Sequence, residues 1–161
     1  MQKLRALKLF QSHHLGRVAI LMGCRPEEIA VLETGHVDLE PTDFQPSQLR
    51  IVGGKTAAAK RMLPFAGEAG EILGRLKAAA EKAGTRNLFH AERNVKLPLS
   101  MSTIETQQAK VDAPFGLYDL RHTFATRAIR SKKVDLPQLA AILGHDGIRS
   151  VMKYSTSIKM T

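Results

Sequence analysis

The chain has 161 residues, of which 43% are hydrophobic and 24% are charged, and these proportions are typical of a folded globular domain. Its single cysteine, Cys24, excludes a disulfide framework and a cysteine-rich zinc site, and suits a reducing cytoplasm. The longest apolar run, residues 18–22, is too short for a signal peptide or a membrane span. We therefore expect a cytoplasmic protein with no membrane partner.

Basic residues outnumber acidic ones by 24 to 15, which gives a formal net charge of +9. The excess lies in three blocks, residues 1–25, 44–64 and 121–161, whereas residues 26–43 carry six acidic side chains and no Lys or Arg. The blocks form either one face for a polyanion or an ordinary solvated surface, and charge alone does not decide between the two. With 5% aromatic residues and no Trp, a stacking platform for single-stranded nucleic acid is not expected.

The first half of the chain predicts two helices followed by a small antiparallel sheet. Residues 15–22 indicate a short buried helix that ends at Gly23. Pro26 suits the first position of the next helix, where Glu27 and Glu28 favour the positive end of the helix dipole. Short strands are expected over residues 36–39, 48–52 and 61–65, with a turn at residues 53–56.

The second half predicts further helices. Hydrophobic periodicity indicates a helix over residues 68–83, and Ser102 and Glu105 fit a capping box that opens a helix toward residue 111. More helices are expected over residues 117–129 and 136–143, the latter ending at Gly144, with a helical turn over residues 149–154. Since no repeat or linker interrupts the chain, we expect one mainly helical α+β domain over residues 1–161, with a small antiparallel β-sheet at one edge.

Four short segments carry residue types that suit chemistry on a phosphodiester. They are Gly23-Cys-Arg-Pro-Glu-Glu28, Gly54-Lys-Thr56, Tyr118-Asp-Leu-Arg-His-Thr-Phe-Ala-Thr126, and Leu143-Gly-His145 followed nine residues later by Tyr154. Breaking a phosphodiester without a metal needs a nucleophile, cations on the non-bridging oxygens and an acid for the leaving alkoxide. Arginine suits the second task because its guanidinium donates two parallel hydrogen bonds and stays charged.

In this order and spacing, the segments resemble the tyrosine recombinases, the phage integrase family, over about residues 15–154. The string over residues 119–126 and the spacing from His145 to Tyr154 are highly specific, whereas the first two segments are weak alone. The resemblance implies a helical catalytic domain that cuts one strand of double-stranded DNA, holds it as a 3′-phosphotyrosine and rejoins it to a new 5′ hydroxyl. It implies no metal and no nucleotide cofactor.

The same resemblance implies a catalytic set of five residues. Arg25 and Arg121 would hold the scissile phosphate and stabilise its transition-state charge. Lys55 would protonate the leaving 5′ oxygen, and His145 would donate a hydrogen bond to the phosphate. Tyr154 would be the nucleophile that forms the covalent bond to DNA.

Several of these residues also suit plainer roles when each is taken alone. Arg25 and Arg121 suit surface salt bridges with nearby acids such as Glu28, and Lys55 suits a solvated turn. Lys60 competes with Lys55 for the role of leaving-group acid, although a phosphate contact suits it better. It is the complete set that favours catalysis.

The chain departs from the family pattern three residues before its second arginine, where Tyr118 stands in place of the usual histidine. A phenol is a weaker base than an imidazole, so the group that activates Tyr154 stays open. The family's histidine at the position of His122 is mainly structural, so we expect His122 to support the catalytic residues together with Glu28 and Tyr118. Tyr154 lies in a polar, basic stretch, where we do not expect an aromatic ring to be buried.

Further basic side chains are expected to contact DNA, namely Lys60, Arg61, Arg127 and Lys153. The chain has no room for the family's N-terminal DNA-gripping domain, and seven residues follow Tyr154. We therefore expect a monomer alone and a tetramer in a full-length recombination complex. Two rival interpretations remain: a type IB topoisomerase, which relaxes supercoils as a monomer, and a non-catalytic DNA-binding remnant, which would not need Tyr154.

Overall fold

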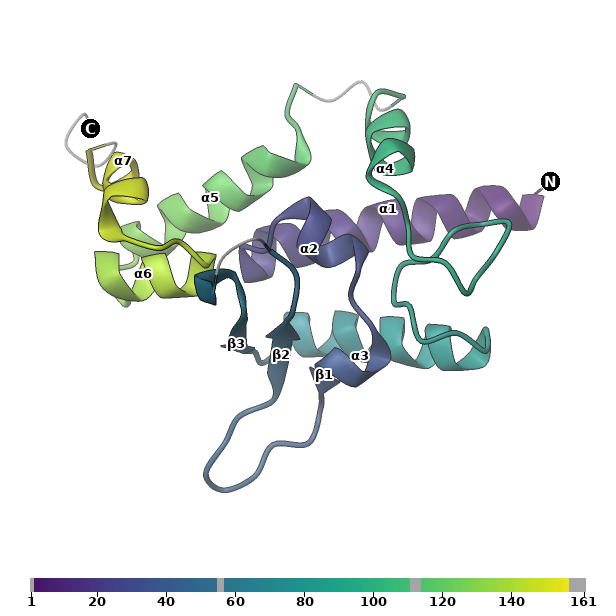
Figure 1. The fold of residues 1–161 in the computed structure, drawn as a ribbon, viewed down its shortest axis with the longest axis horizontal. Helices are drawn as coiled ribbons and strands as arrows, with labels where there is room; N and C mark the ends of the chain where they lie inside the picture. Colours follow the sequence, from purple (N-terminus) through teal and green to yellow (C-terminus); the bar gives the residue numbers. More distant parts are fainter. Residues whose placement is uncertain (1, 55–56, 111–113, 157–161) are drawn as a thin grey trace.

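The computed structural model describes residues 2–54, 57–110 and 114–156. That part of the chain contains seven helices and a small sheet, and the sheet lies on one side of the long first helix (Figure 1). The helices are α1 Gln2–Met22, α2 Pro26–Ala30, α3 Glu68–Lys82, α4 Met101–Gln108, α5 Leu117–Arg130, α6 Leu136–Leu143 and α7 Met152–Thr156. Three short 3₁₀ turns lie in the connections: η1 Thr34–His36 between α2 and β1, η2 Ala57–Ala59 between β2 and β3, and η3 Ile148–Ser150 between α6 and α7. The predicted mainly helical fold is confirmed.

The sheet has the order β1-β2-β3, and both of its strand pairs are antiparallel. Its strands are β1 Val37–Asp38, β2 Gln48–Ile51 and β3 Arg61–Pro64. Leu49 lies opposite both Val37 and Leu63, and all three side chains are buried. This face packs on the core while Arg50 and Met62 face outward, as strand alternation requires. The three predicted strands are therefore confirmed, with β1 shorter than expected.

Helix α1 begins at Gln2 and is much longer than the predicted helix over residues 15–22. The apolar run marks only its buried stripe, in which Leu15, Val18, Ala19 and Met22 follow the helical spacing and are at most 5% exposed. Because no proline or glycine precedes Gly16, nothing in the sequence ends the helix before the apolar run begins. Helix α1 is therefore much longer than the apolar run from which the helix was predicted.

The start of α4 differs from the predicted capping box at Ser102. The N-cap is Ser100, whose hydroxyl accepts a hydrogen bond from the Thr103 amide at 3.2 Å. Leu99 and Ile104, the residues before the cap and at the fourth helical position, are both buried in the same cluster. This hydrophobic staple fixes the entry of the chain into the helix and selects Ser100 over Ser102.

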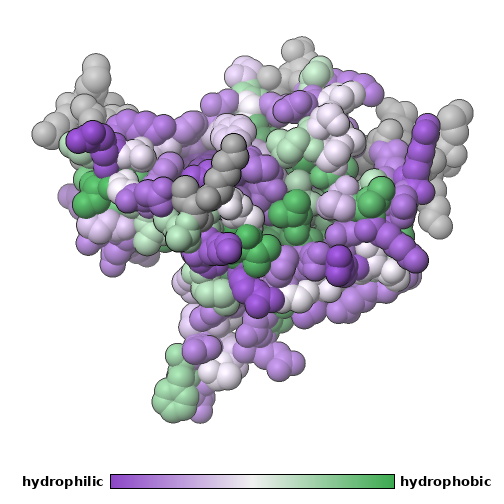
Figure 2. All heavy atoms as spheres, in the orientation of Figure 1, coloured by the Kyte–Doolittle hydropathy of each residue, from purple (hydrophilic) through white to green (hydrophobic). Residues whose placement is uncertain are grey.

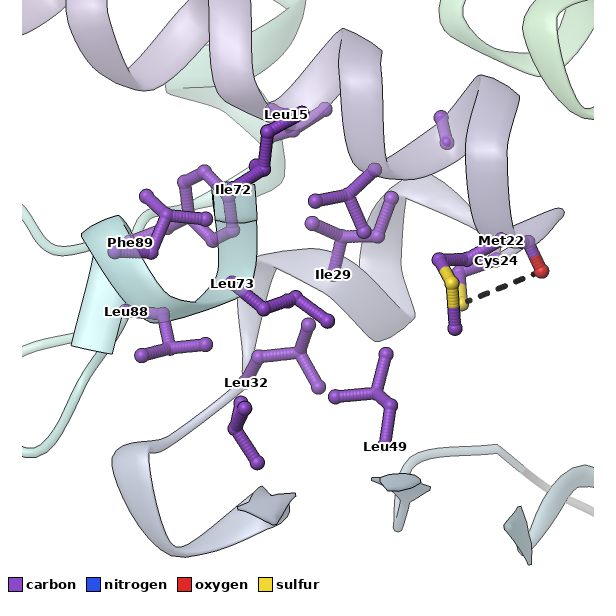
Figure 3. Packing of buried hydrophobic residues seen from close by; sticks show 14 of the residues in the cluster. Leu15, Met22, Cys24, Ile29, Leu32, Leu49, Ile72, Leu73, Leu88 and Phe89 are labelled. Atoms are coloured by element: carbon purple, nitrogen blue, oxygen red, sulfur yellow. Dashed lines mark hydrogen bonds between the residues drawn. The ribbon is translucent and has the colours of Figure 1, made fainter. Parts of the chain in front are cut away.

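Two clusters of buried side chains hold the fold together. The larger lies between α1, α2, α3 and the sheet, where Leu49, Leu73 and Phe89 are fully buried (Figure 3). Each such side chain contributes about 1.5–3 kcal/mol relative to an exposed one. The smaller cluster joins α5, α6 and the segment that leads into α7; its members are Ala125, Leu139, Ala140, Leu143, Val151 and Tyr154.

The surface seen in Figure 2 is mostly hydrophilic. The β1–β2 connection, residues 39–47, extends away from the sheet, and the tip of this projection is hydrophobic (Figures 1 and 2). Residues 39–47 include Phe44, which is 94% exposed, together with the exposed acids Glu40 and Asp43. Across residues 2–54, 57–110 and 114–156, no helix combines the length and the apolar character that crossing a membrane requires.

Candidate active site

Arg121 lies on α5 at the centre of the candidate site and is only 4% exposed. Its Nη1 donates to the Gly23 carbonyl oxygen at 2.6 Å, and its Nη2 donates to the Leu143 carbonyl oxygen at 2.7 Å. These carbonyls stand at the ends of α1 and α6, where helix carbonyls lack partners within the helix. The guanidinium therefore joins the ends of two helices that are distant in sequence.

Gly23 and Gly144 make these helix ends possible. Both adopt positive φ, 67° and 66°, a conformation that favours glycine. A Cβ on Gly23 would lie 2.4 Å from the Phe124 ring, and a Cβ on Gly144 would lie 2.7 Å from Nη1 of Arg61. The predicted helix ends at these two glycines are confirmed, and each turn brings backbone close to an arginine.

Arg25 lies between α1 and α2 and is partly exposed. Its Nη1 donates to Oε1 of Glu28 at 2.8 Å, and its Nη2 donates to the Gly144 carbonyl oxygen at 3.3 Å. Glu28 also accepts from the backbone amide of Arg25 at 2.8 Å, so one carboxylate both caps α2 and orients the Arg25 side chain. The predicted pair of Arg25 and Glu28 therefore exists, but its acid is buried rather than at the surface, since Glu28 is 2% exposed.

Arg61 departs from the predicted DNA contact. Its side chain is 7% exposed, and its Nη1 and Nη2 donate to the two oxygens of Glu28 at 2.9 and 3.0 Å. Its Nε donates to the Ile142 carbonyl oxygen at 2.6 Å, and Nη1 also donates to the Ala59 carbonyl oxygen at 2.8 Å. A guanidinium bound in this way inside the protein is not presented to a DNA backbone, so we assign Arg61 a structural role.

The site concentrates positive charge around one carboxylate. Burial raises the pKa of Glu28, but hydrogen bonds from Arg61 and Arg25 outweigh it and hold the pKa below its usual value. Burial, followed by the charge of Arg25, lowers the pKa of Arg121 to about 10, so the guanidinium stays charged at neutral pH. Burial also raises the pKa of Cys24 to about 12 and keeps its thiol neutral. Three guanidiniums thus face one carboxylate, which leaves two positive charges for an anion.

His145 follows Gly144 directly and lies beside Arg121, with 3.3 Å between Nη2 of Arg121 and Nε2 of the imidazole. Because a guanidinium has no acceptor, Nε2 must accept this hydrogen bond and the ring proton must sit on Nδ1. Burial, then the charges of Arg121 and Arg25, lowers the pKa of His145 to about 4. The imidazole is therefore neutral at pH 7, with its Nδ1–H available as a donor.

Tyr154 on α7 is 5% exposed, so the expectation that its ring is not buried is wrong. Its ring packs in the smaller cluster with Leu139 and Leu143, and Lys153 Nζ lies 5.1 Å from the ring centroid. Its hydroxyl lies 2.5 Å from Nδ1 of His122 on α5. The polar sequence around Tyr154 misleads because neighbouring residues on a helix point about 100° apart, so Lys153 is exposed while Tyr154 is not.

Tyr118 and His122 lie one helical turn apart on α5, on the same exposed side. The hydroxyl of Tyr118 donates to Oε2 of Glu27 on α2 at 2.5 Å. Burial, then the hydrogen bond to Glu27, raises the pKa of Tyr118 to about 12. The sequence analysis did not predict the contact between His122 and Tyr154. The four-residue spacing from Tyr118 to His122 is one signal for it, because this spacing places His122 on the same helix face as the position of the family's usual histidine.

The remaining predicted site residues lie around this centre or outside the described part of the chain. Lys55 falls in residues 55–56, which the structure does not describe. Lys60, Arg127 and Lys153 are exposed, as a DNA contact requires. Within residues 2–54, 57–110 and 114–156, no group of three His, Cys, Asp or Glu side chains is arranged to hold a metal ion.

The sequence model of the phage integrase family matches residues 8–160, so the chain belongs to this family. Its fold is that of the tyrosine recombinase catalytic domain. The chain is similar to the solved structure of XerA recombinase, with a TM-score of 0.72 and 21% identity over 99% of this chain and 60% of that one. No curated protein sequence matches it.

The similar solved structures include complexes with DNA. The XerH site-specific recombinase bound to its difH substrate, in a pre-cleavage complex, has a TM-score of 0.65 and 21% identity over 91% of this chain and 42% of that one. The Tn1549 transposon integrase in complex with transposon right end DNA has a TM-score of 0.64 and 18% identity over 99% of this chain and 63% of that one. The chain therefore spans less than two thirds of each of these proteins.

Proposed function

We propose that this chain cuts and rejoins double-stranded DNA through a covalent 3′-phosphotyrosine, as the catalytic domain of a site-specific recombinase. The observation that carries the proposal is the meeting of Arg25, Arg121 and His145, from three separate parts of the chain, at a site with excess positive charge. Membership of the phage integrase family supports the same reaction.

The charge of the site suits the reaction. A phosphodiester carries one negative charge, and a second develops when a nucleophile adds to phosphorus. Three guanidiniums with one carboxylate offset about that amount of charge, and they are held in place before the reaction begins. Arg25 is the more exposed of the two proposed phosphate ligands, so it meets the phosphate first, while Arg121 forms the floor of the site.

In the proposed reaction, the Tyr154 oxygen attacks phosphorus and the bond from phosphorus to the 5′ oxygen breaks. The electron pair of that bond goes to the 5′ oxygen, which Lys55 protonates. His145 donates from Nδ1 to a non-bridging oxygen. Rejoining is the reverse reaction with the 5′ hydroxyl of another strand. This exchange cuts each of the four strands of two duplexes, so we propose a monomer alone and four copies in the recombination complex.

Exposed basic residues support DNA as the partner. Lys60, Arg127 and Lys153 lie at the surface, and Lys153 adjoins the proposed nucleophile. Contacts of this kind go to phosphates and position a protein on a duplex without reading its sequence. We therefore propose that these three side chains hold the DNA backbone beside the site.

The test is covalent capture on a nicked duplex, from which a short cleaved fragment diffuses away and leaves the protein attached. The parent chain should yield a DNA adduct that survives on a denaturing gel, and Tyr154→Phe should yield none while it still binds the duplex. Absence of adduct from the parent with every duplex tried would contradict the proposal. Relaxation of supercoiled DNA without strand exchange would instead assign the chain to type IB topoisomerase activity.

A further inference from the structure

Among the residues that the structure describes, the Nδ1 atom of His122 lies 2.5 Å from the hydroxyl of Tyr154. The two rings come from different helices, with their centroids 5.7 Å apart and their planes tilted by 43°. At this distance, one of the two groups donates a hydrogen bond to the other. The contact therefore joins the proposed nucleophile to a base.

The direction of this hydrogen bond follows from the ordinary acidities of the two groups, since a phenol (pKa about 10) holds its proton far more tightly than an imidazolium (pKa about 6.5), and the surroundings of the two groups widen this difference. Burial, then the charge of Lys153 from α7, lowers the pKa of His122, and Asp119 on its own helix opposes them only in part. Burial raises the pKa of Tyr154. In the resting protein the proton therefore stays on the phenol, and the Tyr154 hydroxyl donates to a neutral His122 whose ring proton is on Nε2.

Tyr118 stands where the family's usual histidine is expected, but its hydroxyl is bound to a different residue. Its hydroxyl already donates to Glu27, and this bond adds to the burial that raises its pKa. It therefore resists giving up a proton, and as a neutral phenol it is a poor proton acceptor. His122 lies one turn along α5 on the same face, which leaves it in a position to act on the same nucleophile.

We propose that His122 is a catalytic residue that accepts the proton of Tyr154 when this oxygen attacks the DNA phosphate; this inference rests on the proposed function. The O–H bond of Tyr154 breaks, its proton goes to Nδ1 of His122, and its electron pair forms the new bond to phosphorus. The 5′ oxygen leaves with the electron pair of its own bond to phosphorus and takes a separate proton from the acid. In religation, the imidazolium of His122 returns its proton to Tyr154.

Proton transfer accompanies bond formation, because the phenolic oxygen becomes far more acidic as it bonds to phosphorus. A positioned base of this type contributes about 10²–10⁴-fold to a rate. His122→Asn is the sharpest variant, since the asparagine side chain retains a hydrogen-bond acceptor near the position of Nδ1 but has no basic nitrogen. His13→Asn on α1 is the matched control, because His13 is exposed and belongs to no part of the site.

The experiment measures single-turnover adduct formation on the nicked duplex, together with duplex affinity and the thermal midpoint of each variant. We expect His122→Asn to slow adduct formation by about 10²–10⁴-fold, with duplex affinity unchanged, and His13→Asn to match the parent. In His122→Gly, added imidazole should restore a large part of the lost rate, because it supplies the base without repairing the chain.

Two results would overturn the inference while the parent still forms adduct. One is a rate for folded His122→Asn within about threefold of the parent. The other is failure of imidazole to accelerate His122→Gly, combined with a larger rate loss in Tyr118→Phe than in His122→Asn, which would assign the proton to Tyr118. If the parent itself forms no adduct, it is the proposed function that fails, so the two failures are distinguishable.

Discussion

Arg61 and Glu28 form a two-pronged ion pair, with Nη1 and Nη2 of the guanidinium 2.9 and 3.0 Å from the two carboxylate oxygens. Arg61 stands at the start of β3 and Glu28 in the first turn of α2. Since Arg61 also donates to the Ile142 carbonyl of α6, this pair fastens the sheet to the helix ends that carry Arg25 and His145. Because Arg61 fixes the Glu28 carboxylate in place, this carboxylate can in turn orient the side chain of Arg25.

Arg61→Met should be strongly destabilising. It removes the strongest partner of a buried carboxylate, and breaking such a pair typically costs about 3–5 kcal/mol. The free energy of unfolding in urea measures the loss. Arg75→Met is the matched control, because Arg75 pairs with Glu71 at 3.6 Å on the exposed side of α3, with 67% of its side chain accessible. The control should change stability by less than about 1 kcal/mol, and equal losses in both variants would contradict the structural role of Arg61.

Gly144→Ala should cost more than Gly84→Ala. Both glycines have positive φ, so each alanine bears the backbone penalty of about 1–2 kcal/mol. At Gly144 the new Cβ would also lie 2.7 Å from Nη1 of Arg61 and 3.0 Å from the Ala58 carbonyl oxygen, whereas at Gly84 it would meet nothing within 4 Å. Urea unfolding separates the two effects. Equal losses would mean that the close approach of Arg61 to Gly144 adds nothing.

Acid should weaken the fold through His145. Burial and the neighbouring arginines lower its pKa from 6.5 to about 4. Between pH 6.5 and pH 4, this histidine is therefore protonated in the unfolded chain but stays neutral in the folded chain. Stability attributable to this residue is therefore fully present above pH 6.5 and falls as the pH drops toward 4. Unfolding measured across this range should show a shallower pH slope for His145→Gln than for the parent. Parallel slopes would show that His145 is not kept neutral by its surroundings.

Arg121→Lys should impair cleavage although it preserves the charge. A lysine lacks the planar fork that binds the Gly23 and Leu143 carbonyls at once, so the cation moves. Loss of a fixed transition-state donor typically lowers a rate by about 10²–10³-fold. Single-turnover adduct formation measures this effect, and Arg130→Lys, at an exposed position of the same helix, is the control. If Arg121→Lys forms adduct at a rate within a few-fold of the parent, Arg121 does not bind the scissile phosphate.

Lys55 can be tested without knowledge of its position. If it protonates the leaving 5′ oxygen, a duplex with sulfur in place of that oxygen should restore cleavage by Lys55→Ala, because a thiolate leaves without a proton. The same duplex should not restore cleavage by Arg25→Ala, whose defect lies in charge stabilisation. Adduct yields on the oxygen and sulfur duplexes give the comparison. Rescue of both variants, or of neither, would exclude Lys55 as the acid.

The sequence predicts those features that depend only on residues close together along the chain. Helix ends at Gly23 and Gly144, the three strands and the start of α2 at Pro26 follow from local patterns and are observed. The pairing of Arg61 with Glu28 spans 33 positions, and that of His122 with Tyr154 spans 32, so no local rule reveals either. The burial of Tyr154 likewise depends on packing between helices, while its own segment is polar.

The anchoring of Arg121 to two main-chain carbonyls couples catalysis to local stability. One carbonyl belongs to the end of α1 and the other to the end of α6, so partial opening of α6 would release the guanidinium before the rest of the protein unfolds. An oxyanion bound to Arg121 would stabilise the arrangement in which its guanidinium links the ends of α1 and α6. Amide hydrogen exchange in α6 should therefore slow when vanadate or a DNA phosphate binds, although neither ligand needs to touch that helix.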